Sequence, residues 1–301
     1  MIAGAAEHAE RFTALRPLLF TIAYEILGSA SESDDVLQES YLRWAEVDLS
    51  SVRDTKSYLA QLVTRQSLNA LRAQSRRREE YVGPWLPEPL LLDAGDGTDA
   101  SADLVLAESV SMAMMVVLET LTPDERAVFV LREVFGFDHD EIASAIGKST
   151  AAVRQMAHRA RAHVQARRKR FEPVDPRSAE EITARFFTAA ATGDIDGLMA
   201  MLAPDVVWTA DSDGKVSAAR RPVSGAERVA RLLVGLVRAA GENGRVEPAT
   251  FNNAPAMKLY LGDSFEGIIT VELTDGKITN FYAMRNPEKL TGVMVPRRIS
   301  R

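Results

Sequence analysis

The 301-residue sequence contains no cysteine and only four histidines, all at or before His163. The absence of thiols excludes disulfides and thiolate metal sites, and the last third of the chain also lacks imidazole ligands, so we expect no metal and no cofactor. No apolar run approaches the roughly 18 residues of a membrane span, and Glu7, Glu10 and Arg11 break the pattern of a signal peptide. These absences predict a cytoplasmic protein without membrane contact.

An excess of positive charge is also missing, because the formal net charge is -6. The net charge therefore does not favour general binding to polyanions, but the charges are unevenly distributed along the chain. Residues 56–78 contain six basic residues and no acid, whereas residues 79–108 contain eight acids and no basic residue. This asymmetry predicts a basic surface followed directly by an acidic tether.

What the chain does contain is a helix-turn-helix pattern at residues 137–161. Asp138 and Glu141 have the spacing of a capping box for a first helix. Gly147 can adopt the positive φ that the end of this helix requires, and Ser149 or Thr150 can cap a second helix. Such a pair of helices is typical of proteins that read DNA.

The second helix of this pattern is basic, with seven Arg or Lys and no acid in residues 149–170. One face is expected to be buried, and it comprises Val153, Met156, Ala157, Ala160 and Val164. Arg154, His158 and Arg161 lie at i, i+4 and i+7 on another face, where they can reach base edges or phosphates. The alternative is a surface helix with a solvated basic face.

Helical periodicity and turn signals predict a multidomain fold with two all-α parts and an α+β part. Helices are expected within residues 11–78, the last of them at 55–78, and again within 105–170, with one helix from 105 through 118 and another opened by Thr122 and Pro123. The acidic linker between them contains Trp85, Leu86 and apolar residues 90–92, which are costly to leave in water, so we expect it to dock.

Residues 177–301 show a different pattern, with helices interrupted by β-rich runs. Ser178 and Ser224 are expected to cap two helices that end near residues 191 and 240. Strands are expected at 206–210, 256–261, from 268 onward and 278–284, with a hairpin turn at Asp275 and Gly276. This pattern predicts an α+β domain.

Two helical blocks around an acidic linker, the second ending in a helix-turn-helix, resemble the extracytoplasmic-function sigma factors. The resemblance implies domains at 1–78 (sigma region 2), 79–104 (linker), 105–172 (sigma region 4) and 177–301 (tail). It also implies a cytoplasmic, nucleoid-associated protein that directs promoter-specific transcription initiation. Its expected partners are promoter DNA and core RNA polymerase, through the β′ clamp helices and the β flap.

Residues 34–44 resemble the helix of this family that grips the β′ clamp helices. Acids and an amide on an exposed helical face suit a basic, hydrogen-bonding partner. The alternative is a solvated acidic face with Tyr41 and Trp44 in the core. The expected polymerase-binding residues are Asp34, Asp35, Gln38 and Glu39.

Residues 57–78 resemble the helix that opens the promoter -10 element, since aromatic and basic side chains together suit single-stranded DNA. For Tyr58, packing in the core is nearly as good an interpretation. The expected -10 residues are Lys56, Tyr58, Gln61, Arg65, Asn69, Arg72 and Arg76. The expected -35 residues are Ser149, Thr150, Arg154, Gln155, His158, Arg159 and Arg161.

Three short motifs resemble those of sigma factors with a SnoaL-like C-terminal domain, a cone-shaped α+β fold. They are WLPEP at 85–89, DSDGK at 211–215 and NPEKL at 286–290. Ser212 and Asp213 stand where glycines are usual, and Glu288 stands where Asp is usual. A polar turn after a strand would also explain DSDGK, and a simple terminator would also explain Asn286 and Pro287.

The resemblance implies that these motifs form one intramolecular regulatory interface in place of a separate anti-sigma protein. The expected interface residues are Trp85, Leu86, Pro87, Asp211, Asp213, Gly214, Lys215, Asn286, Pro287 and Lys289.

An enzyme is the competing hypothesis, because relatives of this fold include polyketide cyclases that use acid and base catalysis. Such chemistry needs a proton-transfer group that titrates near neutral pH. The tail has no histidine, so Asp211, Asp213, Glu266 and Tyr282 are the remaining candidates. We therefore expect a regulator with no catalytic residue, and a small-molecule-binding or cyclase-type module fused to a DNA-binding part is the alternative.

Overall fold

The computed structural model describes residues 2–78, 80–93, 103–167 and 176–301. The first helical block (residues 2–78) consists of α1 (Ile2–Leu27), α2 (Ala30–Trp44), the short 3-10 turn η1 (Leu49–Ser51) and α3 (Thr55–Arg78). The Ser29 side chain caps α2 by accepting a hydrogen bond from the Glu32 amide, as the local sequence favours. The expected helix at 55–78 is confirmed.

The second helical block (residues 103–167) contains α4 (Leu104–Ser109), α5 (Met112–Leu118), α6 (Pro123–Phe129), the π-helical turn η2 (Val130–Val134), α7 (His139–Ile146) and α8 (Thr150–Arg167). The single helix expected from 105 through 118 is wrong. The chain breaks at Val110, because the Ser111 side chain accepts from the Met114 amide and starts a new helix. The cap by Thr122 with Pro123 at the first helical position is confirmed.

The helix-turn-helix is formed by α7 and α8. The capping box of Asp138 and Glu141 is present, and Gly147 ends α7 with φ of 68°. Ser149 caps α8, since its Oγ accepts from the Ala152 amide at 3.2 Å. The buried face of α8 contains the five residues that periodicity predicts.

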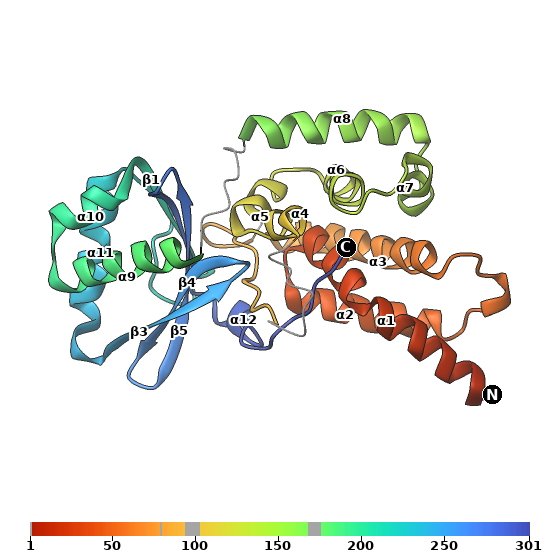
Figure 1. Ribbon diagram of the computed structural model, residues 1–301, viewed down its shortest axis with the longest axis horizontal. Coiled ribbons are helices and arrows are strands. Elements are labelled where there is room, and N and C mark those ends of the chain that lie inside the picture. The colour runs from red at the N-terminus through yellow and green to blue at the C-terminus, as the bar shows by residue number, and fades with distance from the viewer. Residues whose placement is uncertain (1, 79, 94–102, 168–175) are drawn as a thin grey trace.

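The two helical blocks share one hydrophobic core. Leu19, Ile22 and Leu59 of the first block belong to the same buried cluster as Val128 and Val153 of the second. Figure 1 shows the second block lying along α3, with α8 on the outer side. The two blocks therefore form one packed body instead of two separate lobes.

The tail (residues 176–301) is an α+β unit with a mixed sheet of six strands in the order β2-β1-β6-β5-β4-β3. The strands are β1 (Leu202–Asp211), β2 (Val223–Ser224), β3 (Gly244–Phe251), β4 (Ala254–Leu261), β5 (Ser264–Thr274) and β6 (Lys277–Met284). β1 and β6 pair in parallel, and the other neighbours are antiparallel. The expected turn at Asp275 and Gly276 is confirmed, with φ of 51° and 70°.

The tail helices are α9 (Pro176–Thr192), α10 (Ile195–Met201), α11 (Ala226–Ala240), the 3-10 turn η3 (Gly241–Asn243) and α12 (Pro287–Leu290). Figure 1 shows α9, α10 and α11 on one side of the sheet, away from the helical blocks. Two expected caps are wrong. α9 begins two residues before Ser178, and Gly225 with φ of 98° precedes α11 while Ser224 pairs in β2.

The linker (residues 80–93) crosses between the sheet and the helices and docks as expected, with Leu86 and Leu90 buried and Trp85, Leu91 and Leu92 half-buried. Leu86 packs with Met112, Tyr282 and Met284, and Leu90 enters the shared helical core. The opposite face of the sheet thus rests on the linker and on α5. Across the described residues, no helix is both long and apolar enough to span a bilayer.

Candidate functional site

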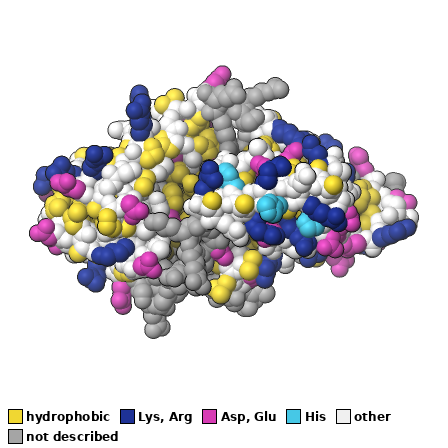
Figure 2. Space-filling view, turned by 90° about the horizontal axis from the view of Figure 1, so that it is seen from above, with side chains coloured by type: hydrophobic (Ala, Val, Ile, Leu, Met, Phe, Trp, Pro, Cys, Tyr) yellow, Lys and Arg dark blue, Asp and Glu magenta, His cyan; other side chains and the backbone are white. Residues whose placement is uncertain are grey.

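The outer face of α8 is exposed, and a shallow hollow on it is lined by Arg154, Gln155, His158 and Arg159. Figure 2 shows Lys, Arg and His side chains gathered along this helix. Arg159 and Arg161 are paired with Glu125 at 3.1 Å and Glu133 at 2.6 Å. These pairs are exposed and therefore weak, so phosphate oxygens can compete for both guanidinium groups.

The remaining -35 candidates lie at the start of α8. Ser149 is exposed, and the Thr150 hydroxyl donates to Asp140 at 2.6 Å. Both hydroxyls thus contribute to the turn between α7 and α8. The seven -35 candidates therefore lie on one continuous helical surface that faces solvent.

The -10 candidates on α3 are in a different situation, because the second helical block contacts several of them. Arg65 donates to the main-chain oxygens of Ser144 at 2.7 Å and Ala145 at 3.1 Å, at the end of α7. Gln61 accepts from the Ser144 hydroxyl at 3.4 Å, and Arg72 pairs with Asp124 at 2.6 Å. In this arrangement, these side chains, which are expected to contact DNA, form their hydrogen bonds and ion pair with the second helical block instead.

Tyr58 keeps 37% of its surface exposed, although its ring lies 5.6 Å from that of Trp44. Lys56 and Asn69 are exposed. Arg76 lies within α3, and its side chain is outside the described residues. The α3 face is therefore largely exposed, and the second block binds some of its polar groups.

The acidic face of α2 carries the polymerase-binding candidates. Asp35, Gln38 and Glu39 are exposed, and Glu39 pairs with Arg43 one turn later at 3.0 Å. Asp34 differs from them. Its two oxygens contact Arg16 at 3.0 Å and Arg297 at 2.6 Å, and 27% of its side chain is exposed.

Asp211, at the end of β1, joins the tail to the linker although it is fully buried. Its carboxylate accepts from the Tyr81 hydroxyl, from the Leu86 amide at 2.7 Å and from the Lys289 ammonium at 2.8 Å. A buried carboxylate is stabilised by such a set of donors, one of them charged. The hydroxyl bond also raises the pKa of Tyr81, after burial as the main cause.

Lys289 on α12 is the counterpart of Asp211. Its ammonium donates to the Leu86 carbonyl at 2.7 Å and lies 3.2 Å from the centroid of the Trp85 ring. Burial lowers the pKa of Lys289, and the Asp211 charge opposes this shift. The cation is thus held between a carboxylate and an aromatic face, an arrangement that favours its charged form.

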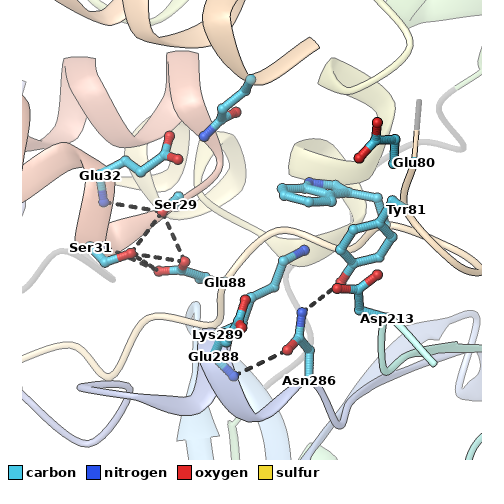
Figure 3. A pocket seen from close by; sticks show the side chains of 12 residues that line it. Ser29, Ser31, Glu32, Glu80, Tyr81, Glu88, Asp213, Asn286, Glu288 and Lys289 are labelled. Carbon is cyan, nitrogen blue, oxygen red and sulfur yellow. Dashed lines mark hydrogen bonds between the residues drawn. The ribbon is translucent and has the colours of Figure 1, made fainter. Parts of the chain in front are cut away.

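The other motif residues complete this contact, part of which is shown in Figure 3. The Asn286 amide donates to the Tyr81 hydroxyl at 2.8 Å, and Asp213 accepts from the Val82 amide at 3.2 Å. A side chain at Gly214 would meet Val82 at 3.2 Å. Lys215 pairs with Asp213 at 3.0 Å and Glu288 at 2.7 Å, so it connects the two tail motifs. Pro87 is buried and Pro287 is the first residue of α12.

Glu88 is a functional candidate that the sequence reasoning missed, although it lies inside WLPEP. Its carboxylate accepts from the Ala30 amide at 2.8 Å, the Ser31 amide at 3.1 Å and the Ser29 hydroxyl at 2.8 Å. It therefore caps the positive end of the α2 dipole, and α2 carries the acidic face described above. Figure 3 shows Glu88 against this helix end. The sequence feature that could have identified Glu88 is an acidic residue within an otherwise apolar linker motif.

Asn252, in the turn between β3 and β4, was missed as well. It is 1% exposed, and its Nδ2 donates to the Tyr24 hydroxyl at 3.0 Å and to the Val110 carbonyl at 2.8 Å. Its Oδ1 accepts from the Leu90 amide at 2.8 Å. One tail side chain thus contacts both helical blocks and the linker. The Asn-Asn turn was visible in the sequence, but its burial was not.

A buried polar contact also joins the helical blocks. Arg126 on α6 donates to the Glu25 carbonyl at 2.7 Å and pairs with Glu119 at 2.6 Å. The Glu25 side chain accepts from Ser109 at 2.6 Å, and burial raises the pKa of Glu25 to about 8. No local pattern in the sequence indicates that these residues meet.

The catalytic candidates of the enzyme hypothesis are engaged in other contacts. Asp211 and Asp213 belong to the interface above, Glu266 pairs with Arg285 at 2.9 Å, and the Tyr282 hydroxyl donates to Glu272 at 2.9 Å. The side of the sheet beneath the helices is filled by Phe186, Trp208 and Phe281, with ring centroids 5.1 and 5.5 Å apart. These contacts do not assemble a proton-transfer site.

Comparisons with known families agree with the helical blocks. Residues 11–77 match Sigma-70 region 2, and residues 111–164 match Sigma-70, region 4. The two matches contain α2 and α7, all but the last residue of α3, and most of α8. They therefore include the helices that carry the acidic and basic faces.

Relatives extend the likeness to the tail. The ECF RNA polymerase sigma factor SigJ of Mycobacterium tuberculosis is 37% identical over 290 residues, which cover 93% of this chain and 92% of that protein. The probable ECF RNA polymerase sigma factor SigI of the same species is 28% identical over 287 residues, or 91% and 92% of the two chains. The crystal structure of SigJ has a TM-score of 0.74 and 34% identity, and covers 94% of this chain and 98% of that one.

Proposed function

The chain belongs to the extracytoplasmic-function RNA polymerase sigma factors, with a SnoaL-like tail, and we propose how its surfaces divide the work of transcription initiation. The exposed acidic face of α2 docks on the β′ clamp helices of core polymerase, and the second helical block contacts the β flap. α3 holds the opened -10 element, and α8 reads the -35 element. The protein works in the cytoplasm, at the nucleoid.

The observation that carries this assignment is the exposed basic face of α8, which lies opposite its buried stripe. Arg, Gln and His side chains in that position suit base edges in a major groove. Run-off transcription with purified core polymerase tests it. A promoter-specific transcript that appears only when this protein is added supports the assignment. If core polymerase with this protein gives no such transcript on any promoter tested, the assignment is contradicted.

The contacts of Arg65 and Arg72 indicate that the structure is a closed form. Their guanidinium groups donate hydrogen bonds to oxygens of α7 and α6, and the DNA strand of the -10 element would have to displace these contacts. The second block must therefore move from α3 before the -10 element can be held. The polar contacts on α3 are largely exposed, but the two blocks also share a hydrophobic core, so binding energy from polymerase and DNA must offset the loss of this apolar burial.

The tail controls this movement, because it contacts both helical blocks and the linker that joins them. Asp211 and Lys289 hold the linker, and Asn252 contacts the two blocks. As part of the same chain, the tail acts at an effective concentration of about millimolar, so a modest contact suffices to keep the form closed. It takes the place of a separate anti-sigma protein and has no catalytic role.

Removal of residues 176–301 tests this control. We expect the -10 face to be uncovered in a larger fraction of molecules, which can be measured as protection of α3 amides from hydrogen exchange. The promoter output should change with it at matched protein levels. Unchanged exchange and unchanged transcription would leave the tail as an independent module.

A further inference from the structure

The last segment of the chain leaves the tail after Val293, which still packs against Phe251, Ala256 and Ile268 of the tail. We name residues 291–301 the C-terminal strap, which passes from α12 to α1 (Figure 1). Arg297 forms a parallel bridge with the linker, with its amide 2.8 Å from the Leu91 carbonyl and its carbonyl 2.9 Å from the Asp93 amide. The Ser300 amide donates to Thr21 on α1 at 3.1 Å. The strap is therefore fixed to the linker and to the first helical block.

The Arg297 side chain reaches the proposed polymerase-docking helix. Its Nη2 lies 2.6 Å from Asp34 Oδ2, and its guanidinium carbon lies 5.7 Å from the centroid of the Phe20 ring. Both partners of the ion pair are half-buried, with side-chain exposures of 23% and 27%. Of the four acidic or amide residues proposed to dock on polymerase, Asp34 is the one that another part of the chain covers.

We propose that the strap and core polymerase compete for Asp34, so that Arg297 occupies the position of a basic group on the polymerase surface. This inference rests on the proposed docking by α2. Arg297 adds a second guanidinium to a carboxylate that Arg16 already contacts at 3.0 Å, which lowers its attraction for a further cation, and Ile299 of the strap packs against the helical core. Docking by polymerase would then require the strap to leave α2.

Release of the strap has a second consequence, because the same residue holds the linker. When the Arg297 side chain leaves Asp34, its ion pair no longer helps to hold the main-chain hydrogen bonds of Arg297 with Leu91 and Asp93 in place. Polymerase docking would thus loosen the linker that lies between the helical blocks and the tail. Because such coupling is reciprocal, a firmly docked strap must weaken polymerase binding by the same factor.

The test compares Arg297→Ala with Arg298→Ala in the full chain. Arg298 is the neighbouring residue of the same type, and it pairs with Asp93 of the linker at 2.8 Å. This pair is more exposed, with side-chain exposures of 66% and 37%, so its loss loosens the strap less and leaves the pair of Arg297 with Asp34 in place. Both variants are titrated with purified core polymerase, and their folds are checked by circular dichroism. We expect Arg297→Ala to bind core polymerase about two- to fivefold more tightly, the range of one partly exposed ion pair, and Arg298→Ala to stay within about twofold of wild type.

A truncation that removes residues 296–301 should gain at least as much affinity and leaves NPEKL in place. Hydrogen exchange gives a second measurement, since the amides of Asp93, Arg297 and Ser300 should lose protection when polymerase binds the wild type. Retained protection in the complex, or equal or weaker binding by Arg297→Ala, would overturn the competition. If the wild type does not bind core polymerase at all, the proposed docking fails instead, which is a distinct result.

Discussion

Replacement of Asn252 by Asp should open the closed form. The amide nitrogen now donates to the Tyr24 hydroxyl and to the Val110 carbonyl, and both bonds are buried. Aspartate has nearly the same shape and tolerates the positive φ of 53°, but it removes both N–H donors and places a carboxylate oxygen beside a carbonyl. The change therefore affects hydrogen bonding and charge, with little effect on packing or the turn.

The expected cost follows from the number of groups left without partners. A buried polar group that loses its hydrogen bond costs about 1–3 kcal/mol, so two such groups give about 2–6 kcal/mol. These bonds exist only while the tail contacts both helical blocks. At about 1.4 kcal/mol for each factor of ten, the equilibrium should shift at least about tenfold toward the open form.

Asn253 provides the matched control. It is the next residue in the same turn, has φ of 56° and is exposed. Asn253→Asp introduces the same chemical change in water, where the expected effect is within about 0.5 kcal/mol. A difference between the two variants therefore reports on the buried contacts of Asn252.

The distance between the helical blocks can be measured directly, because the native sequence has no cysteine to interfere with labelling. Cysteines at Glu46 and Ala162, both exposed, place one dye on each block. Asn252→Asp should lower energy transfer and increase hydrogen exchange of α3 amides, and Asn253→Asp should not. Wild-type transfer in a folded Asn252→Asp protein would refute the assigned role of this residue.

Three further predictions concern the docking face, the reading helix and pH. Charge reversal of Asp35 and Glu39 to Lys should abolish co-elution with core polymerase while the circular dichroism spectrum is unchanged, since both side chains are exposed; co-elution of the folded double variant would remove α2 from the docking surface. Arg154→Ala should cost about 1–3 kcal/mol of binding free energy on the protein's own promoter and relax the base specificity at one -35 position. Arg167→Ala should instead weaken binding to all DNA sequences alike and lower the slope of log affinity against log salt concentration by about one. Equal losses on specific and scrambled DNA would reassign Arg154 to phosphate contact. Burial raises the pKa of Glu25 to about 8 from an ordinary 4.5, so between these values the folded form holds a proton that the unfolded form releases. The free energy of unfolding should therefore fall as pH rises from about 5 to 8. Glu25→Gln should flatten this pH dependence in denaturant titrations, and an unchanged dependence would exclude Glu25 as its source.

Local sequence determined much of the secondary structure and the family. The capping box of Asp138 and Glu141, the αL glycine at 147 and the stripe on α8 depend on neighbours within a few residues, so they could be read in order along the chain. The same short range explains the errors. Ser111 and Gly225 compete locally with a continued helix or a serine cap, and propensity alone does not decide such competitions.

Tertiary structure alone decided which of these surfaces are free. Asp34 and Arg65 look like free partners of polymerase and DNA, yet Arg297 pairs with the first and main-chain oxygens of α7 accept hydrogen bonds from the second. Asn252 gained its role from burial between three segments distant in sequence. A hydrogen bond between such segments depends on how whole elements pack, because no local pattern encodes the distance between two side chains that lie far apart along the chain.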